Sequence, residues 1–136
     1  MKSVAKILLY DQADHVLILH RSGTHPYFPH EVDLPGGEID RGETAAQAVV
    51  REVLEETGLV IGLDSVSLAH HRRTLYGRRD NIFTAHLTTV EPAVAISWEH
   101  ESYAWIDAGQ LEDSLDTRDD YMVVVRRHLS AATVNK

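Results

Sequence analysis

The sequence predicts an α/β fold in which a mixed β-sheet lies between helical layers. Three observations predict it: strand-length apolar runs lie on both sides of one strongly helical segment, a second helical pattern closes the chain, and 43% of the residues are hydrophobic. A chain of 136 residues with this composition can bury a core of useful size. Because we find no linker, repeat or low-complexity segment, we expect residues 1–136 to form one domain.

The chain begins with two predicted strands. Residues 4–10 and 16–20 are apolar runs of strand length, and the polar residues 11–14 between them predict a hairpin turn. Residues 22–31 contain one glycine and two prolines, which predicts a loop.

Three histidines and two aromatic residues lie in or beside this loop. His20, His25 and His30 have no spacing typical of a compact zinc site, and Tyr27 and Phe28 lie between them. Two interpretations stay open for the histidines: they are solvated polar groups of a loop, or they form a wall that contacts a base or phosphate.

Residues 44–57 predict a helix. They have good helix propensity and no internal glycine or proline, and Gly58 follows where a left-handed C-cap is expected. One side is apolar and should pack on the core, with Leu54 at its edge. The residues of this stripe are Ala46, Val49, Val50 and Val53.

The opposite side of this helix is crowded with acids. Glu52, Glu55 and Glu56 are three or four residues apart, so their carboxylates fall within roughly 100° of arc on neighbouring turns. They also occupy the C-terminal half of the helix, where the helix dipole disfavours negative charge. Arg51 can pair with Glu55, but one guanidinium cannot neutralise three carboxylates, and Glu43 adds a fourth acid just before the helix.

A divalent cation would resolve this repulsion. Several oxygen ligands on a rigid element suit Mg²⁺ or Mn²⁺, which keep some waters and often recruit substrate phosphates. The alternative is a dense but solvated acidic face. The preceding residues 34–37, Leu-Pro-Gly-Gly, favour the metal site, because two glycines allow a sharp turn and close approach of the backbone to an ion or phosphate.

Residues 37–59 resemble the Nudix box, in which a glycine is followed at fixed spacing by Glu, then Arg-Glu and an aliphatic residue, then Glu-Glu, and finally Gly and an aliphatic residue. The matching residues are Gly37, Glu43, Arg51, Glu52, Val53, Glu55, Glu56, Gly58 and Leu59, without a departure. The resemblance implies a MutT-like Nudix hydrolase with an α/β/α sandwich. Such an enzyme uses Mg²⁺ to cleave a phosphoanhydride in a nucleoside diphosphate linked to another group.

The resemblance also implies roles for residues of the box. It places metal ligands at Glu52, Glu55 and Glu56, often with the carbonyl at the position of Gly36, and it has Arg51 orient a glutamate. The cofactor is then Mg²⁺, for which Mn²⁺ can substitute.

Beyond the box, residues 65–76 and 82–90 read as two strands joined by a basic turn. Four arginines fall within eight residues here, and we expect one or two of them to bind the polyphosphate of a substrate, because a guanidinium binds phosphate oxygens in a bidentate fork. The candidates are Arg72, Arg78 and Arg79, with Arg73 as the fourth arginine. The alternative is that they pair with surface acids or protect a strand edge with charge.

Residues 98–107 form the second informative stretch. Residues 103–106 predict a strand, and Glu99 and Glu101 lie in the loop that should enter it. The family often places a metal-binding or basic glutamate in such a loop, and Glu101 is favoured over Glu99; exposed loop acids are the alternative. Trp98 either stacks on a base or caps the core, whereas Trp105 is predicted to be a core residue.

Two helical segments are predicted near the end of the chain. Residues 107–115 suggest a short helical turn, and residues 117–120 open a terminal helix with acids in its first turn. This helix should cover the second face of the sheet through an apolar stripe. The stripe comprises Tyr121, Val124, Val125, His128 and Leu129.

Composition excludes several classes of function. A formal net charge of −8 argues against general nucleic-acid binding, and the lack of cysteine excludes disulfides, zinc–thiolate sites and thiol nucleophiles. No apolar run approaches membrane-spanning length, and the N-terminus lacks the pattern of a secretion signal. We expect a cytoplasmic protein whose partner is a small nucleotide, with a homodimer left open.

The predicted function is hydrolysis by water, since the chain offers no plausible covalent nucleophile. Glu52 or Glu101 would take the proton. A single small domain favours a nucleoside triphosphate, including an oxidised one, as substrate. The alternatives are an ADP-ribose, dinucleotide or nucleotide-sugar pyrophosphatase, a regulator that binds nucleotide without turnover, and an isoprenoid diphosphate isomerase relative, although that chemistry usually needs a cysteine.

Overall fold

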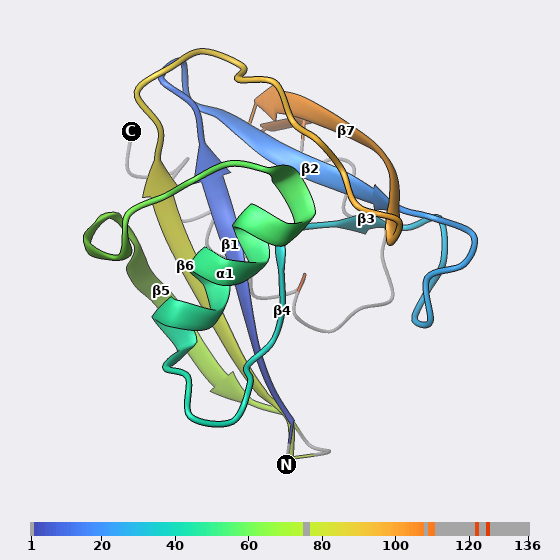
Figure 1. The fold of residues 1–136 in the computed structure, drawn as a ribbon, viewed down its shortest axis with the longest axis vertical. Helices are drawn as coiled ribbons and strands as arrows, with labels where there is room; N and C mark the ends of the chain where they lie inside the picture. Colours follow the sequence, from blue (N-terminus) through green and yellow to red (C-terminus); the bar gives the residue numbers. More distant parts are fainter. Residues whose placement is uncertain (1, 75–76, 108, 111–121, 123–124, 126–136) are drawn as a thin grey trace.

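One helix lies across a twisted mixed sheet in the computed structural model, which describes residues 2–74, 77–107, 109–110, 122 and 125 (Figure 1). The elements follow in the order β1 (Ser3–Tyr10), β2 (His15–Arg21), β3 (Val32–Asp33), β4 (Gly36–Glu38), α1 (Ala45–Thr57), the 3₁₀ turn η1 (Leu63–Ser65), β5 (Ser67–Arg73), β6 (Arg79–His86) and β7 (His100–Asp107). In the part of the chain so described, no helix is long and apolar enough to cross a lipid bilayer.

The sheet has the strand order β3-β2-β1-β6-β5, with β4 paired to β1 and β7 paired to β2. β1 and β6 run parallel, and the other pairs are antiparallel. β1 and β2 pair only at Tyr10 and Val16, so the hairpin opens away from its turn. β4 then pairs with the first half of β1, where Lys6 lies opposite Gly36. This divergence leaves room for a site between β4 and the end of β2.

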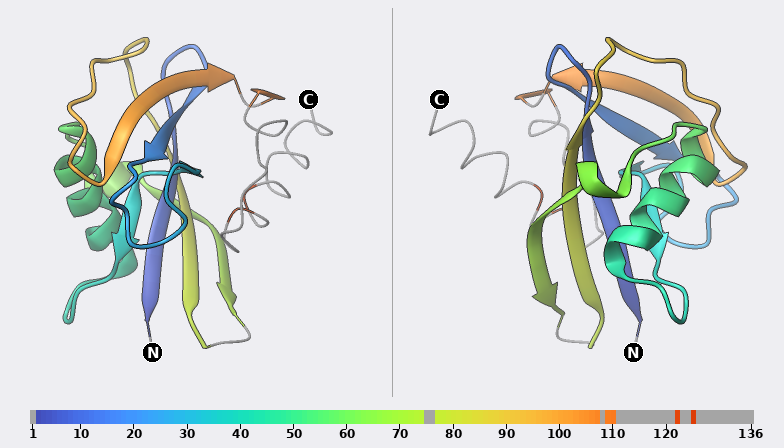
Figure 2. Two further views of the ribbon diagram at one scale, coloured as in Figure 1. Left: turned by 90° about the vertical axis from the view of Figure 1, so that its right-hand side faces the viewer. Right: turned by 60° about the vertical axis from the view of Figure 1, so that its left-hand side comes forward.

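Helix α1 is set by its caps. The Thr44 side chain accepts a hydrogen bond from the Gln47 N–H, and the Gln47 side chain accepts one from the Thr44 N–H, which forms a capping box. Gly58 ends the helix with φ of 74°, a left-handed conformation that favours glycine. Both ends agree with the prediction, and α1 covers one face of the sheet, as the edge-on view in Figure 2 shows.

The core has one layer on each face of the sheet, because side chains alternate along a strand. The layer under α1 contains Ile7, Leu9 and Val53, and the layer on the other face contains Leu8 and Ile82. Met122 and Val125 are buried in that second layer. The rest of the predicted terminal helix and its stripe lies outside the described residues, as does most of the turn predicted at 107–115.

The predicted α/β class with a mixed sheet is confirmed. The hairpin of β1 and β2, the loop at residues 22–31 and the antiparallel pair β5–β6 all form, although β6 begins at Arg79, inside the predicted turn, and ends at His86. The predicted start of the last strand is wrong: β7 begins at His100, so Glu101 lies in the strand and only Glu99 in the loop. The sequence does not mark this start, because the first residues of β7 are polar and Glu101, Ser102 and Tyr103 are exposed in succession, as they would be in a loop.

Candidate active site

The acids of α1 reach the backbone of β4 because two glycines leave room for them. The Gly36 N–H donates a 2.7 Å hydrogen bond to Glu56 Oε1. A methyl group at Gly37 would lie 2.8 Å from Glu52 Oε1. The Gly-Gly step therefore lets two carboxylates from the helix lie directly against the sheet.

Glu56 and Glu52 lie in a setting that disfavours their negative charge. Glu56 is only 4% exposed, and burial raises its pKa well above the ordinary value, although Lys6 and the Gly36 N–H favour the charged form. Burial likewise raises the pKa of Glu52, despite the nearby Arg51 guanidinium. Bringing a divalent cation to these oxygens would offset both costs, so the pair fits a hard metal ion.

Arg51 organises the outer part of the acid cluster. Its Nε lies 2.8 Å from Glu43 Oε2, and its Nη1 lies 3.0 Å from Glu52 Oε1 and 3.1 Å from Glu55 Oε2. The carboxylates of Glu43, foremost, and Glu52 raise the pKa of Arg51. The Glu55 side chain is 56% exposed, so this predicted ligand lies at the rim while Glu52 and Glu56 lie within.

A buried ion-pair network that sequence reasoning missed lies beneath the acids. Asp33 Oδ1 contacts Lys6 Nζ at 3.0 Å and Arg21 Nη2 at 3.2 Å, and Asp33 Oδ2 contacts His100 Nε2 at 3.1 Å. Burial opposes the charge of Asp33, but Lys6, His100 and Arg21 hold its pKa well below the ordinary value. The signal in the sequence is the single lysine inside the apolar strand β1.

His100 connects this network to the acid cluster. Its Nδ1 lies 3.6 Å from Glu56 Oε2, while its Nε2 contacts Asp33. The imidazoles of His25 and His100 and the carboxylate of Asp33 have ligand atoms within 4.8 Å of one another, a spacing that could hold a metal. Because Asp33 already contacts two cationic side chains, a further cation would be repelled, and we assign the group to the ion-pair network.

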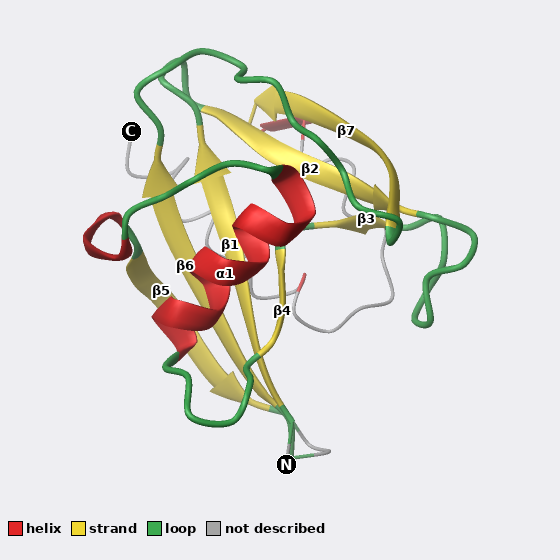
Figure 3. Cartoon of the chain, in the orientation of Figure 1, coloured by secondary structure: helices red, strands yellow, loops and turns green. Residues whose placement is uncertain are grey.

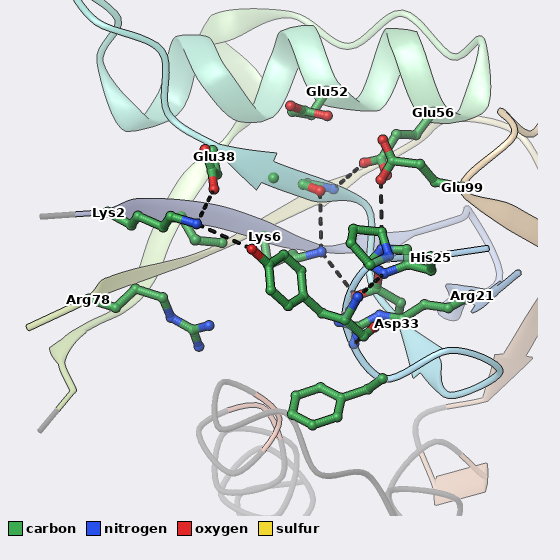
Figure 4. Close-up of a pocket in the computed structure, with 16 residues that line it drawn as sticks. Lys2, Lys6, Arg21, His25, Asp33, Glu38, Glu52, Glu56, Arg78 and Glu99 are labelled. Atoms are coloured by element: carbon green, nitrogen blue, oxygen red, sulfur yellow. Dashed lines mark hydrogen bonds and ion pairs between the residues drawn. The ribbon is translucent and has the colours of Figure 1, made fainter. Parts of the chain in front are cut away.

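A cavity of about 410 Å³ opens beside both sets of residues. Figure 4 shows the acids of α1 on one side of it and the basic side chains on the other. The lining groups are mainly acids, bases and rings, contributed by strands β1 to β4, by α1, by the loop after β2 and by the segments just before β1, β6 and β7. They are Lys2, Val4, Lys6, Arg21, His25, Pro26, Tyr27, Phe28, Asp33, Gly36, Gly37, Glu38, Glu52, Glu56, Arg78 and Glu99.

Of the three arginines predicted to bind substrate, Arg78 lines the cavity and the other two do not. Arg78 Nε lies 2.8 Å from Asp80 Oδ1, a carboxylate that is 1% exposed. Arg72 approaches the same carboxylate at 3.6 Å from β5. Arg79 is exposed at the start of β6, opposite Arg73. The turn before β6 thus places the guanidinium of Arg78 at the cavity.

Of the two candidate glutamates near β7, Glu99 lines the cavity. Its Oε2 lies 3.7 Å from His25 Nε2. Glu101 is not among the lining residues; its side chain is 47% exposed and its Oε1 lies 3.4 Å from His30 Nδ1. Glu99 lies in the turn before β7, whose backbone bonds Ser22 beside the loop at residues 22–31, whereas Glu101 lies within β7 beside His30.

The loop at residues 22–31 forms one wall of the cavity. Figure 3 shows this loop beyond the end of β2, and the Ser22 N–H bonds the Glu99 carbonyl of the loop before β7. The Tyr27 hydroxyl accepts a 3.3 Å hydrogen bond from Lys2 Nζ. His25 therefore lies in the wall of the cavity, whereas His30 is two-thirds exposed; contact of His25 with a base or phosphate stays a prediction.

The two tryptophans take different places. Trp105 Nε1 donates to the Pro92 carbonyl at 3.1 Å, and its ring packs against the core under α1, which agrees with the prediction. Trp98 is 69% exposed and does not cap the core.

Comparison with known proteins gives a family match over most of the chain. The model of the NUDIX domain matches residues 1–126. A Bacillus subtilis (strain 168) protein named "Putative 8-oxo-dGTP diphosphatase" is 30% identical over 107 residues, which cover 79% of this chain and 67% of that protein. The Escherichia coli (strain K12) 8-oxo-dGTP diphosphatase is 40% identical over 43 residues, 32% of this chain and 33% of that protein.

Solved structures share the fold at low sequence identity. The MutT protein from Methanosarcina mazei Go1 superposes with a TM-score of 0.75 and 24% identity, covering 99% of this chain and 95% of that one. A Caenorhabditis elegans Ap4A hydrolase in a binary complex superposes with a TM-score of 0.73 and 22% identity, covering 98% and 99%.

Proposed function

The chain belongs to the NUDIX domain family of hydrolases, and from this premise we propose that it is a Mg²⁺-dependent pyrophosphohydrolase acting on a nucleoside triphosphate. One observation carries the proposal. The acids Glu52 and Glu56, the guanidinium of Arg78 and the ring of Tyr27 line a single cavity, so groups suited to a metal, a polyphosphate and a base lie together.

The residues present fit the metal that the family uses. Glu52 and Glu56 offer carboxylate oxygens on a rigid helix, the ligand type that Mg²⁺ and Mn²⁺ prefer. Glu55, paired with Arg51 at the rim, is the proposed third acid of this set. A bound divalent cation would offset charge on the phosphate oxygens and make the attacking water a better nucleophile.

The residues that line or support the cavity have distinct roles in the proposed reaction. Arg78, fixed by Asp80, binds phosphate oxygens, and Tyr27 stacks on the base. Arg51 orients Glu52 through its 3.0 Å contact. These groups position the substrate, and the proposed reaction forms no covalent intermediate with the protein.

The reaction is a displacement by water. A P–O bond forms to the water oxygen, the P–O bond of the anhydride breaks, and the products are a nucleoside monophosphate and pyrophosphate. A carboxylate accepts the proton that the water loses. Glu52 and Glu99 line the cavity and are the best placed; the predicted base Glu101 lies outside it.

Two relatives support the choice of a nucleoside triphosphate, since the names of the Bacillus and Escherichia proteins specify the oxidised nucleotide 8-oxo-dGTP. A cavity of about 410 Å³ lies toward the small end of ligand sites, which span roughly 300–1,000 Å³, and so favours a mononucleotide over a dinucleotide.

A substrate screen tests the proposal. The purified chain is incubated with dGTP, 8-oxo-dGTP, ADP-ribose and Ap4A in Mg²⁺ or Mn²⁺, and the nucleotide products and pyrophosphate are separated and measured by anion-exchange chromatography. We expect pyrophosphate from a triphosphate and no release when EDTA is present. Turnover of ADP-ribose or Ap4A in preference to every triphosphate would overturn the substrate class, and turnover in EDTA would overturn the metal dependence.

A further inference from the structure

We propose that the Lys6 ammonium is a resident cation of the acid cluster and takes the place at the Gly36 carbonyl that a metal ion would otherwise occupy. The inference rests on the metal-dependent function proposed above. It concerns how many cations the site recruits from solution and where they bind.

The position of Lys6 is unusual for its charge. It lies in the middle of β1, between buried apolar residues, and is 7% exposed. A buried ammonium is costly unless it is paired and hydrogen-bonded. Its Nζ lies 3.0 Å from Asp33 Oδ1 and 3.2 Å from the carbonyl oxygens of Leu34 and Gly36. Three oxygens thus meet the three donors of an ammonium.

The surroundings keep this side chain charged. Although burial opposes the charge, the carboxylates of Asp33 and Glu56 raise the pKa of Lys6 above its ordinary value. In return, Lys6 favours the charged forms of Glu52 and Glu56. Lys6 therefore supplies the acid cluster with a fixed positive charge from the side of the sheet.

The peptide group of Gly36 lies between the carboxylate of Glu56 and the ammonium of Lys6. Its N–H donates to Glu56 Oε1 at 2.7 Å, and its carbonyl accepts from Lys6 Nζ at 3.2 Å. A metal ion on that carbonyl would lie about 2.1 Å from the oxygen and next to the ammonium. Because like charges repel strongly where water is scarce, the ion and the ammonium exclude each other there.

Two fixed cations therefore flank the acids, with Lys6 on the sheet side and Arg51 on the outer side. Metal ions are left to bind between Glu52 and Glu56 on the side that faces the cavity. Removing the charge of Lys6 should free the Gly36 carbonyl and increase the affinity of the cluster for cations.

Calorimetric titration with Mn²⁺ in the absence of nucleotide tests this inference. The Lys6→Gln variant keeps a hydrogen-bond donor on the side chain beside Asp33 but loses the ammonium that lies on the Gly36 carbonyl. We expect Mn²⁺ to bind it at least about tenfold more tightly than it binds the wild type, or with one more ion per chain. Lys2→Gln is the matched control, because Lys2 lines the same cavity but its side chain is 60% exposed. The control should change affinity less than about twofold.

The outcomes separate this inference from the proposed function. Equal or weaker Mn²⁺ binding by Lys6→Gln, with normal binding by the wild type, would overturn the role of Lys6 alone. No Mn²⁺ binding by any of the three proteins would overturn the metal-dependent function and this inference with it.

A measurement on the wild type covers the case in which Lys6→Gln does not fold. Anomalous scattering from crystals soaked in Mn²⁺ should place the metal at the carboxylates of Glu52 and Glu56, with Lys6 Nζ still on the Gly36 carbonyl. A Mn²⁺ ion within about 2.5 Å of that carbonyl oxygen would overturn the inference.

Discussion

Two opposing requirements act on Glu56: the fold buries its carboxylate, whereas metal binding needs that carboxylate to be charged. Its carboxylate is almost fully buried, accepts a hydrogen bond from the Gly36 N–H and lies 3.6 Å from His100 Nδ1. Burial alone would favour an apolar residue or a neutral acid here. A charged glutamate is useful at this position only if a cation joins it, which is why the metal-dependent proposal centres on it.

The substitution Glu56→Gln should therefore separate stability from activity. The introduced amide would keep an oxygen for the Gly36 N–H and present an NH₂ group to His100, so we expect the melting temperature to stay within a few degrees. We expect kcat to fall by at least about 100-fold, because the proposed metal ligand is lost. Steady-state kinetics with the preferred triphosphate and thermal melts by circular dichroism measure both effects.

The control for this variant is Asp64→Asn, which removes an exposed acid on η1 and should leave kcat unchanged. Near-wild-type kcat for Glu56→Gln would contradict the assignment of Glu56 to the metal site.

A second comparison decides between the glutamates near β7. We expect Glu99→Gln to lower kcat by about tenfold or more and Glu101→Gln to lower it much less, because Glu99 lines the cavity and Glu101 pairs with His30 outside it. The profile of kcat against pH for both variants provides the measurement. A larger loss for Glu101→Gln would restore the role predicted for it from the sequence.

At the scale of elements, β4 controls how closely the helix approaches the sheet. This strand has only three residues, and its two glycines are constrained differently. Gly36 has φ of 134°, and a Cβ there would lie 2.1 Å from the Ala5 carbonyl oxygen. The three atoms nearest to a Cβ at Gly37 all belong to the flexible end of Glu52. Gly36 is thus required because a side chain would clash with the backbone of β1, and Gly37 is required because a side chain would displace Glu52.

Alanine substitutions should show this difference. Gly36→Ala clashes with backbone that cannot move, so we expect a loss of at least about 3 kcal/mol in the free energy of unfolding. Gly37→Ala should fold normally but displace the Glu52 carboxylate, lowering kcat by about tenfold or more. Urea titration and kinetics distinguish the two. Equal loss of stability in both variants would contradict the distinction.

At the scale of the whole molecule, one buried carboxylate connects segments far apart in the chain. Asp11, in the turn between β1 and β2, is 1% exposed and accepts hydrogen bonds from the N–H groups of Ala13, His15 and Glu91. Burial opposes its charge, but His15 and these backbone donors lower its pKa to about 2. Asp11 thereby fixes the loop after β6 to the hairpin turn.

This pKa predicts an acid-sensitive contribution to folding. A carboxyl group whose folded-state pKa lies below its ordinary value of 3.8 stabilises the fold fully above about pH 4 and loses that contribution as the pH falls toward 2. We expect the contribution to be about 1–2 kcal/mol. Urea titrations between pH 2 and pH 6 measure it.

The matched variant is Asp11→Asn, which does not titrate. The difference in unfolding free energy between wild type and variant should shrink as the pH falls from 4 to 2. A difference that stays constant across this range would show that Asp11 has the same pKa in the folded and unfolded chains.

Local patterns sufficed for much of the fold. The cap residues Thr44 and Gly58 determine the ends of α1, and the polar turn after β1 determines the first hairpin, because these signals act between residues close in sequence. The short strands β3 and β4 were not predictable in this way. They exist only because β1 and β2 diverge and leave backbone groups for them to pair with.

The sequence by itself determined the family, the acid cluster and the helix that presents it, since fixed spacing on one helix places Glu52 and Glu56 on neighbouring turns. The tertiary structure alone decided which other residues join them. Lys6, Asp33 and His100 come from three strands and meet beneath the acids through contacts between distant parts of the chain. The physical reason is that a charged side chain buried in a sheet pairs with a charged group on another strand. The pairing depends on the register between strands, which cannot be read from the sequence of either strand alone.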